Sequence, residues 1–158
     1  MDTNRKIAVA VGVLYIIGTV SGILSVVFSG PLLDASDYLA EIAANDTQLV
    51  IAALFVLSMG LSLALIPIIA FPVLRKQNET LARGYVVFRG ALETVSYLVT
   101  VLAMLLLVPV GEEYVKASGA DVSGYRAVGT LLKKAPDYMG SVGTFVFLIG
   151  AVMFYTVL

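Results

Sequence analysis

Two charged residues, Arg89 and Glu93, stand inside an otherwise apolar stretch of this chain, Tyr85-Val-Val-Phe-Arg-Gly-Ala-Leu-Glu93. A charged side chain in hydrocarbon costs about 2.5–3.5 kcal/mol on insertion scales, so such residues persist where they are paired or functional. The two residues are four positions apart, which places them on one face of a helix. The spacing therefore predicts a buried ion pair. Such a pair would either bind a small molecule, lipid or ion, as in a binding or transport protein, or only fix the packing of a structural or regulatory subunit.

Tyrosines at a similar depth extend this prediction to a candidate polar cluster. Tyr97 continues the Arg89–Glu93 face of the same helix, and side chains on a helix lean toward its N-terminus, so Glu93 should lean toward Arg89. Counting from the ends of the apolar stretches places tyrosines of two other stretches at the same level. The candidate binding residues or buried polar cluster are Arg89, Glu93, Tyr97, Tyr15 and Tyr155.

The residue types that usually perform catalysis are missing. The chain has no histidine and no cysteine, which removes the commonest general base, thiolate nucleophiles and the usual soft metal ligands. We therefore predict no catalytic residues, no metal site and no cofactor. An intramembrane enzyme is a third alternative, and it would need Glu93 or a tyrosine as its acid or base.

The composition indicates which elements must position these residues. Of the 158 residues, 59% are hydrophobic and 13% are charged, whereas soluble domains carry about 25% charged residues. The net charge of −1 gives no basic field that would attract nucleic acid. These features predict an all-α, polytopic transmembrane helix bundle forming a single domain over residues 1–158, with the lipid bilayer as its partner. The four predicted spans are residues 7–28, 49–74, 81–108 and 138–158.

Turn and cap signals mark the expected limits of the spans. Pro109-Val-Gly111 should end the third span, and Asp137 should cap the start of the fourth. The two connections on the other side each carry apolar residues at helical spacing, so both predict short amphipathic helices in the outer loops, with the second ended by Pro136. The simpler alternative is that these helices only cap the bundle. The residues with this spacing are Ala35, Tyr38, Leu39 and Ile42 in one connection and Tyr125, Val128 and Leu132 in the other.

Positive residues near the span ends predict the orientation. Arg5, Lys6, Arg75, Lys76 and Arg83 gather at the N-terminus and in the second connection, while no Lys or Arg occurs between positions 30 and 50. By the positive-inside rule, the N-terminus is cytoplasmic and the protein is a multi-pass protein of the plasma membrane.

Small residues and prolines predict how the spans pack. Small residues let helix backbones approach closely, either within one bundle or between two copies in a homo-oligomer. Pro67 and Pro72 predict kinks in the second span, and they free the backbone carbonyls of Leu63 and Ile68, near which we expect Arg89 to lie. The predicted packing residues are Gly18, Gly22, Ser58, Gly60 and Ser62.

The C-terminal end of the chain is apolar up to Leu158, and no basic residue follows the last span. A span that ends on the cytoplasmic side usually meets Lys or Arg there. We therefore expect the chain to be the N-terminal part of a longer protein, whose further helices would be its partners.

Two segments of the chain resemble a prokaryotic membrane protein family, domain of unknown function 4386. They are the opening run from Arg5 to Ser25 and the run Ala82-Arg-Gly-Tyr-Val-Val-Phe-Arg89, followed by the acid Glu93. The resemblance implies a multi-span helical membrane protein, usually longer than this chain, and it implies no particular activity.

Overall fold

Four long helices span the length of the molecule, and they confirm the predicted all-α transmembrane bundle. In the computed structural model, which describes residues 2–119 and 121–157, four helical stretches are long and apolar enough to cross a membrane. The first is α1 (Thr3–Leu33) and the second is α3 (Asp46–Leu74). The third consists of α4 (Glu79–Tyr85), the π-helical segment η1 (Val86–Leu92) and α5 (Glu93–Lys116), and the fourth is α6 (Asp121–Val157).

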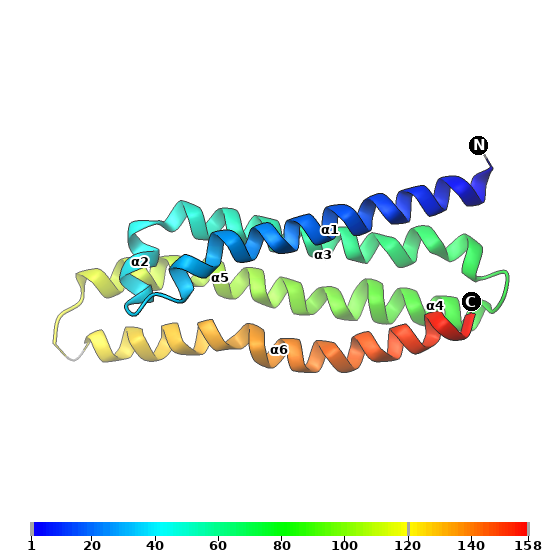
Figure 1. The fold of residues 1–158 in the computed structure, drawn as a ribbon. Helices are drawn as coiled ribbons and strands as arrows, with labels where there is room; N and C mark the ends of the chain where they lie inside the picture. The colour runs from blue at the N-terminus through cyan, green and yellow to red at the C-terminus, as the bar shows by residue number, and fades with distance from the viewer. Residues whose placement is uncertain (1, 120, 158) are drawn as a thin grey trace.

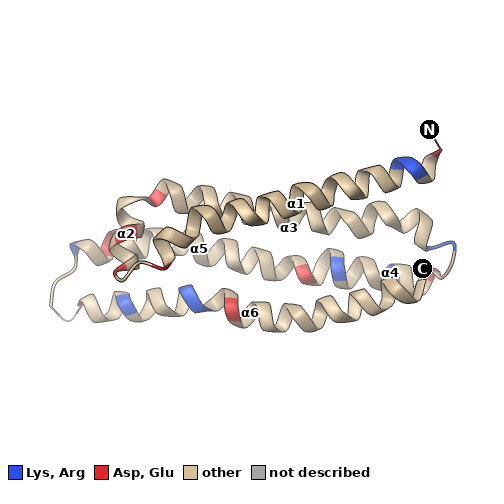
Figure 2. Ribbon diagram, viewed as in Figure 1, with Lys and Arg blue, Asp and Glu red and all other residues tan. Residues whose placement is uncertain are grey.

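The helices lie side by side, with both chain termini at one end of the bundle and the short helix α2 (Tyr38–Ala44) at the other (Figure 1). We call these the terminal end and the α2 end. α1 packs mainly against α3, α3 packs against α5 and η1, and α6 packs against α5, η1 and α4. Charged residues gather toward the two ends (Figure 2), and Arg89 and Glu93 lie within the third span.

Three of the spans run past their predicted limits through prolines that lie inside helices rather than at their ends. Pro31 lies in α1, Pro109 in α5 and Pro136 in α6. The predictions that Pro109-Val-Gly111 ends the third span and that Asp137 caps the fourth are therefore wrong. Packing against neighbouring helices and local backbone adjustment let membrane helices continue through proline.

The two connections predicted to form amphipathic helices have different outcomes. The first forms α2, whose Leu39 and Ile42 are almost fully buried, so α2 caps the bundle instead of lying on the membrane surface. The second is helical but is not a separate helix, because α6 runs without a break from Asp121 through Pro136. Leu158, the predicted end of the fourth span, lies outside the described residues.

The buried apolar core is concentrated near the α2 end. Leu39, Ile42, Leu49 and Leu107 are among the most deeply buried side chains, and all four belong to one cluster formed by α2, α3 and α5. A smaller cluster at the terminal end joins Ala82 and Tyr85 of α4 to Leu74 of α3 and Val157 of α6. The charged part of the third span lies between these two clusters.

Candidate functional site

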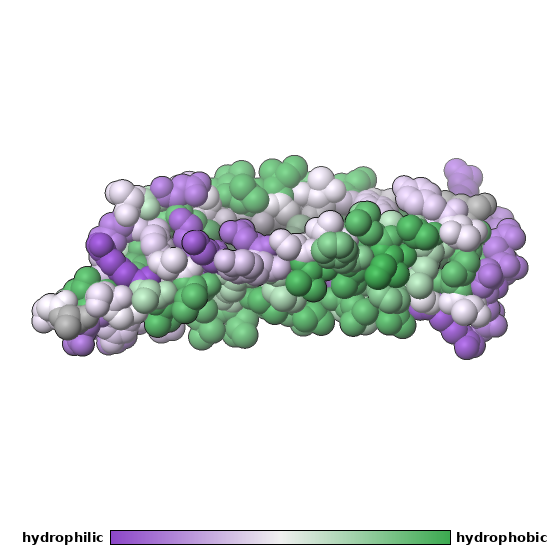
Figure 3. All heavy atoms as spheres, turned by 90° about the horizontal axis from the view of Figure 1, so that it is seen from below, coloured by the Kyte–Doolittle hydropathy of each residue, from purple (hydrophilic) through white to green (hydrophobic). Residues whose placement is uncertain are grey.

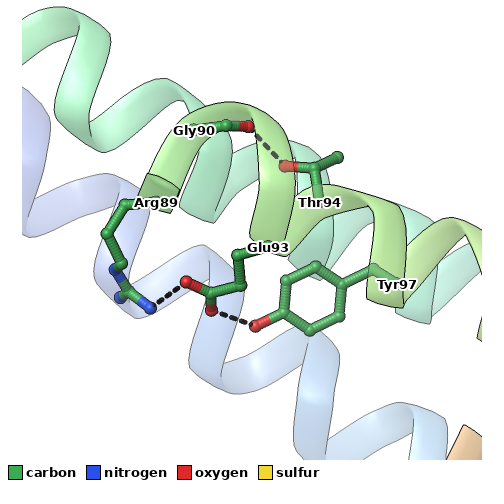
Figure 4. A network of polar contacts seen from close by, with 5 residues as sticks. All are labelled: Arg89, Gly90, Glu93, Thr94 and Tyr97. Carbon is green, nitrogen blue, oxygen red and sulfur yellow. Dashed lines mark hydrogen bonds and ion pairs between the residues drawn. The ribbon is translucent and has the colours of Figure 1, made fainter. Parts of the chain in front are cut away.

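A π-helical turn presents Arg89 to the interior. Within η1 the helix widens, and the backbone N–H of Glu93 bonds to the carbonyl of Phe88, five residues earlier. Gly90 in this turn lies against α3, where an added Cβ would be 3.3 Å from Cγ of Pro67. The hydroxyl of Thr94 donates to the Gly90 carbonyl at 2.6 Å (Figure 4). π-helical turns within α-helices occur frequently at functional sites.

Arg89, Glu93 and Tyr97 form a closed hydrogen-bonded set, which we call the triad (Figure 4). Arg89 donates from Nη1 to Oε2 of Glu93, and the Tyr97 hydroxyl donates to Oε1 at 2.8 Å. The side chains of Arg89 and Glu93 are only 11% and 8% exposed. In the described part of the chain, no buried side-chain polar atom lacks a partner, and Arg89 and Glu93 neutralise each other.

Arg89 faces the fourth span, not the second. Its guanidinium carbon lies 4.5 Å from the centroid of the Phe147 ring, and its aliphatic stem passes over Gly150, where an added Cβ would be 2.8 Å from Cγ of Arg89. The hydrogen bond of Arg89 goes to Glu93, and Ile68 on the second span is 53% exposed. Among the described residues, the expected hydrogen bond from Arg89 to the freed carbonyl of Leu63 or Ile68 is not made, and Gly90 meets Pro67 instead.

The tyrosines of the predicted cluster separate in the structure. Tyr15 on α1 interacts electrostatically with the Arg89 region, although its side chain is 44% exposed. Tyr155 is 75% exposed and packs edge-on against Phe154, so its assignment to the buried cluster is wrong. Its position along α6 could be counted from the sequence, but the direction in which its side chain points could not. Tyr85, which is 3% exposed and interacts with Arg89, was missed, although its position four residues before Arg89 indicated a shared face.

The predicted packing and kink residues also take different positions. Gly18 and Ser62 are buried at the α1–α3 contact, and Gly22 lies under the sulfur of Met59. Gly60 receives the side chain of Tyr97, because an added Cβ would be 2.8 Å from Cβ of Tyr97.

Ser58 and the two prolines of α3 differ in their burial. Ser58 is exposed, so the packing prediction is wrong for this residue. Both prolines lie within α3; Pro67 is almost fully buried against η1, whereas Pro72 is exposed.

Three adjoining cavities form what we call the central groove. The first, about 650 Å³, lies between α1 and α6 toward the α2 end, with α3 and α5 at its base. The second, about 220 Å³, lies one helical turn further along α5 and α6, and Glu93 and Tyr97 line it. The third, about 600 Å³, lies along α1 and α3 and shares Val26 with the first.

Polar residues of α1, α2, α5 and α6 line the central groove. Figure 3 shows polar residues extending from the α2 end into the molecule between apolar surfaces. The groove is open because α1 and α6 do not pack against each other along their lengths in the described residues. At the α2 end the ammonium group of Lys133 bridges them by donating to the carbonyl of Leu33. The hydroxyl-bearing residues that line the groove are Thr19, Ser25, Ser29, Ser96, Thr100, Thr130 and Thr144, together with the tyrosines Tyr15, Tyr38 and Tyr97.

A second polar cluster, which the sequence did not indicate, ties three helices together at the α2 end. The Tyr114 hydroxyl donates to Oδ2 of Asp37 at 3.1 Å, and it accepts from Arg126 Nη2 at 2.7 Å. Arg126 also lies over the Tyr114 ring at 5.5 Å from its centroid. The three residues are 77 and 12 positions apart, so no local spacing signals the cluster.

The comparisons with known proteins agree with this architecture. Among residues 2–119 and 121–157, no group of acidic residues is placed to hold a metal ion. Neither the search of curated proteins nor the search of solved structures gave a match. A family model described as a domain of unknown function, DUF4386, matches residues 10–158. The chain therefore belongs to the DUF4386 family of proteins, here with four helices suited to crossing a membrane.

Proposed function

We propose that this protein binds an amphiphilic molecule, a lipid in the first instance, in the central groove. The observation that carries the proposal is the polar lining of a groove that opens sideways between two membrane helices. Polar groups at membrane depth are stable where they are buried in protein or line a cavity that holds water or a polar ligand. The groove meets this condition, and its walls carry apolar residues beside the polar ones.

The hydroxyl groups along the groove support binding of a molecule with both polar and apolar parts. Ser25 donates to the carbonyl of Gly22 at 2.8 Å, and Thr144 donates to that of Gly140 at 2.9 Å. These backbone bonds satisfy the hydroxyl donors, and each hydroxyl oxygen can still accept a hydrogen bond. Val26, Val56 and Met104 line the same space and would contact the apolar part of a ligand.

The triad would either contact the ligand or only fix the packing of the helices. Because Glu93 and Tyr97 line the second cavity, the triad would meet the ligand at the inner part of the groove. The alternative is a structural or regulatory subunit in which the pair only fixes packing. It is favoured by the closed hydrogen bonding of Glu93 and by the close packing of Arg89 on Gly150.

The setting of the protein is part of the same proposal. A multi-pass location in the plasma membrane with a cytoplasmic N-terminus is supported by the positions of Arg5, Lys6, Arg75 and Lys76 at the terminal end. Further helices of a longer protein, or a second copy of the chain, are the partners that would lie along the exposed apolar faces of α1 and α6.

A groove-filling substitution tests the proposal. Thr100 lines the groove, whereas Leu102, two positions later on α5, is 57% exposed on the outer face. We expect Thr100→Trp to lose the lipid that co-purifies with the protein, measured by native mass spectrometry, and Leu102→Trp to retain it. Absence of bound lipid in the unaltered protein, or equal retention in both variants, would contradict lipid binding in the groove.

A further inference from the structure

We infer that the mouth of the central groove recognises a phospholipid whose headgroup carries both a phosphate and an amine, such as phosphatidylethanolamine. This inference rests on the proposed lipid binding and names the class of lipid. The mouth is lined by two lysines and two aspartates, Lys133, Lys134, Asp34 and Asp137. Their formal charges cancel, which matches a headgroup that carries one charge of each sign.

The four charges face the groove without neutralising one another. In the described part of the chain, neither lysine forms an ion pair with either aspartate. Lys133 is held in place by its bond to the Leu33 carbonyl and by the ring of Tyr38, 4.9 Å from its nitrogen. Lys134 and Asp137 are exposed. The mouth therefore offers two cations to a phosphate and two carboxylates to an ammonium group.

The position of these residues along the helices agrees with a headgroup. Lys133 and Lys134 come just before the long apolar part of α6, and Asp34 directly follows the last residue of α1. These positions correspond to the boundary between hydrocarbon and water. Ser29 lies five residues below Asp34, or about 7.5 Å at the rise of a helix, which is the level at which the glycerol part would lie.

The deeper part of the groove suits acyl chains. The third cavity shares Val26 with the first and is lined mainly by apolar side chains, among them Ile23, Met59 and Leu63. From Asp34 to Tyr15 the groove follows 19 residues of α1, or about 28 Å, whereas half of the hydrocarbon core is about 15 Å thick. An acyl chain below the headgroup therefore fits within the length of the groove.

Charge complementarity distinguishes this headgroup from the simpler ones. A purely anionic headgroup would meet Lys133 and Lys134, but it would leave Asp34 and Asp137 facing negative charge. A headgroup without phosphate would leave both lysines unpaired. A phosphate with a nearby amine satisfies both pairs at once, so the preference should follow the two pairs separately.

The experiment uses the delipidated full chain and lipids with identical acyl chains. Binding of dioleoyl phosphatidylethanolamine, dioleoyl phosphatidylglycerol and dioleoylglycerol is measured by native mass spectrometry, with thermal unfolding as a second readout. We expect phosphatidylethanolamine to bind about tenfold more tightly than dioleoylglycerol, the order expected for hydrogen bonds to charged groups. Free phosphoethanolamine at the same concentration should neither bind nor stabilise the protein.

Variants separate the two charge pairs. Within the described residues, Lys134 makes no hydrogen bond or ion pair to another helix. Lys134→Gln should therefore weaken phosphatidylethanolamine binding about tenfold, and adding Lys133→Gln should reduce this binding to the level of dioleoylglycerol. Asp34→Asn with Asp137→Asn should remove the preference over phosphatidylglycerol. Lys116→Gln, a charge change at the same end but outside the groove, should bind like the unaltered protein.

Each contrary result has its own meaning. Equal binding of dioleoylglycerol and phosphatidylethanolamine, with both lost in Thr100→Trp, would overturn the headgroup assignment and leave groove binding intact. Equal binding of the two phospholipids would overturn the role of the aspartates, and equal stabilisation by free phosphoethanolamine would identify a soluble ligand instead of a lipid. If no lipid binds, or if the groove is covered in a dimer that lipid does not dissociate, both the headgroup assignment and the proposed function fail.

Discussion

The Tyr97 hydroxyl donates to Oε1 of Glu93 at 2.8 Å, on the oxygen that the Arg89 ion pair leaves unused. One carboxylate thus joins two consecutive turns of α5 to the π-helical turn before it. The tyrosine completes the solvation of a charge that the bilayer cannot solvate.

Replacing Tyr97 with phenylalanine should remove this bond while keeping the ring in its place on Gly60. Because the acceptor is a buried carboxylate, we expect a loss of about 1.5–3 kcal/mol in the free energy of unfolding, measured in detergent. Tyr155→Phe is the matched control, since Tyr155 is 75% exposed and its loss should change little. Equal effects of the two variants would show that the Tyr97 bond contributes nothing.

Glu93→Ala should destabilise the protein more than Glu93→Ala combined with Arg89→Leu. The single change leaves a buried guanidinium without its carboxylate, at a cost of about 3–5 kcal/mol, whereas the double change removes both charges. Thermal unfolding of the two variants in the same detergent measures the difference. An equal or larger loss in the double variant would mean that the two side chains do not depend on each other.

Gly60→Ala should separate α3 from α5. The added methyl group would come within 2.8 Å of Cβ of Tyr97, an atom next to the backbone that cannot rotate away. We expect a destabilisation of about 1–3 kcal/mol, as for other overpacked sites. Gly12→Ala, where an added Cβ has nothing within 4 Å, should leave the unfolding temperature unchanged or slightly raised.

The predicted orientation is tested by labelling at the α2 end. Ser36 lies exposed between α1 and α2, and the chain has no cysteine of its own. A Ser36→Cys variant in intact cells should react with a membrane-impermeant maleimide added from outside. Reaction only after the cytoplasmic side is exposed would reverse the orientation.

The architecture of the chain could be predicted because four apolar stretches of sufficient length leave few alternatives to a helix bundle. The limits of the helices could not, because Pro109 and Pro136 end helices in water but are tolerated between packed membrane helices.

The part of the site that lies on one helix could be predicted, whereas the contacts between helices could not. The spacing of Arg89, Glu93 and Tyr97 fixes a shared face on one helix, so their proximity follows from local geometry. The rotation of one helix against another depends on packing along its whole length, which is why Tyr155 points outward and Arg89 meets α6 instead of Pro67. No local spacing predicted the widening of η1, in which Gly90 lies against Pro67 of α3.

Because α1 packs on α3, α3 on α5 and α5 on α6, the α3–α5 contact is the central one of the bundle, and α1 and α6 are its outer helices. The distance between α1 and α6 therefore depends on the angle at which α3 and α5 pack against each other. Where α3 meets the third span, the ring of Tyr97 rests on Gly60, and Gly90 rests on Pro67. Gly60, Gly90 and Pro67 do not line the central groove, yet their packing governs its width, so a methyl group added at Gly60 would alter the size of the molecule that the groove can hold.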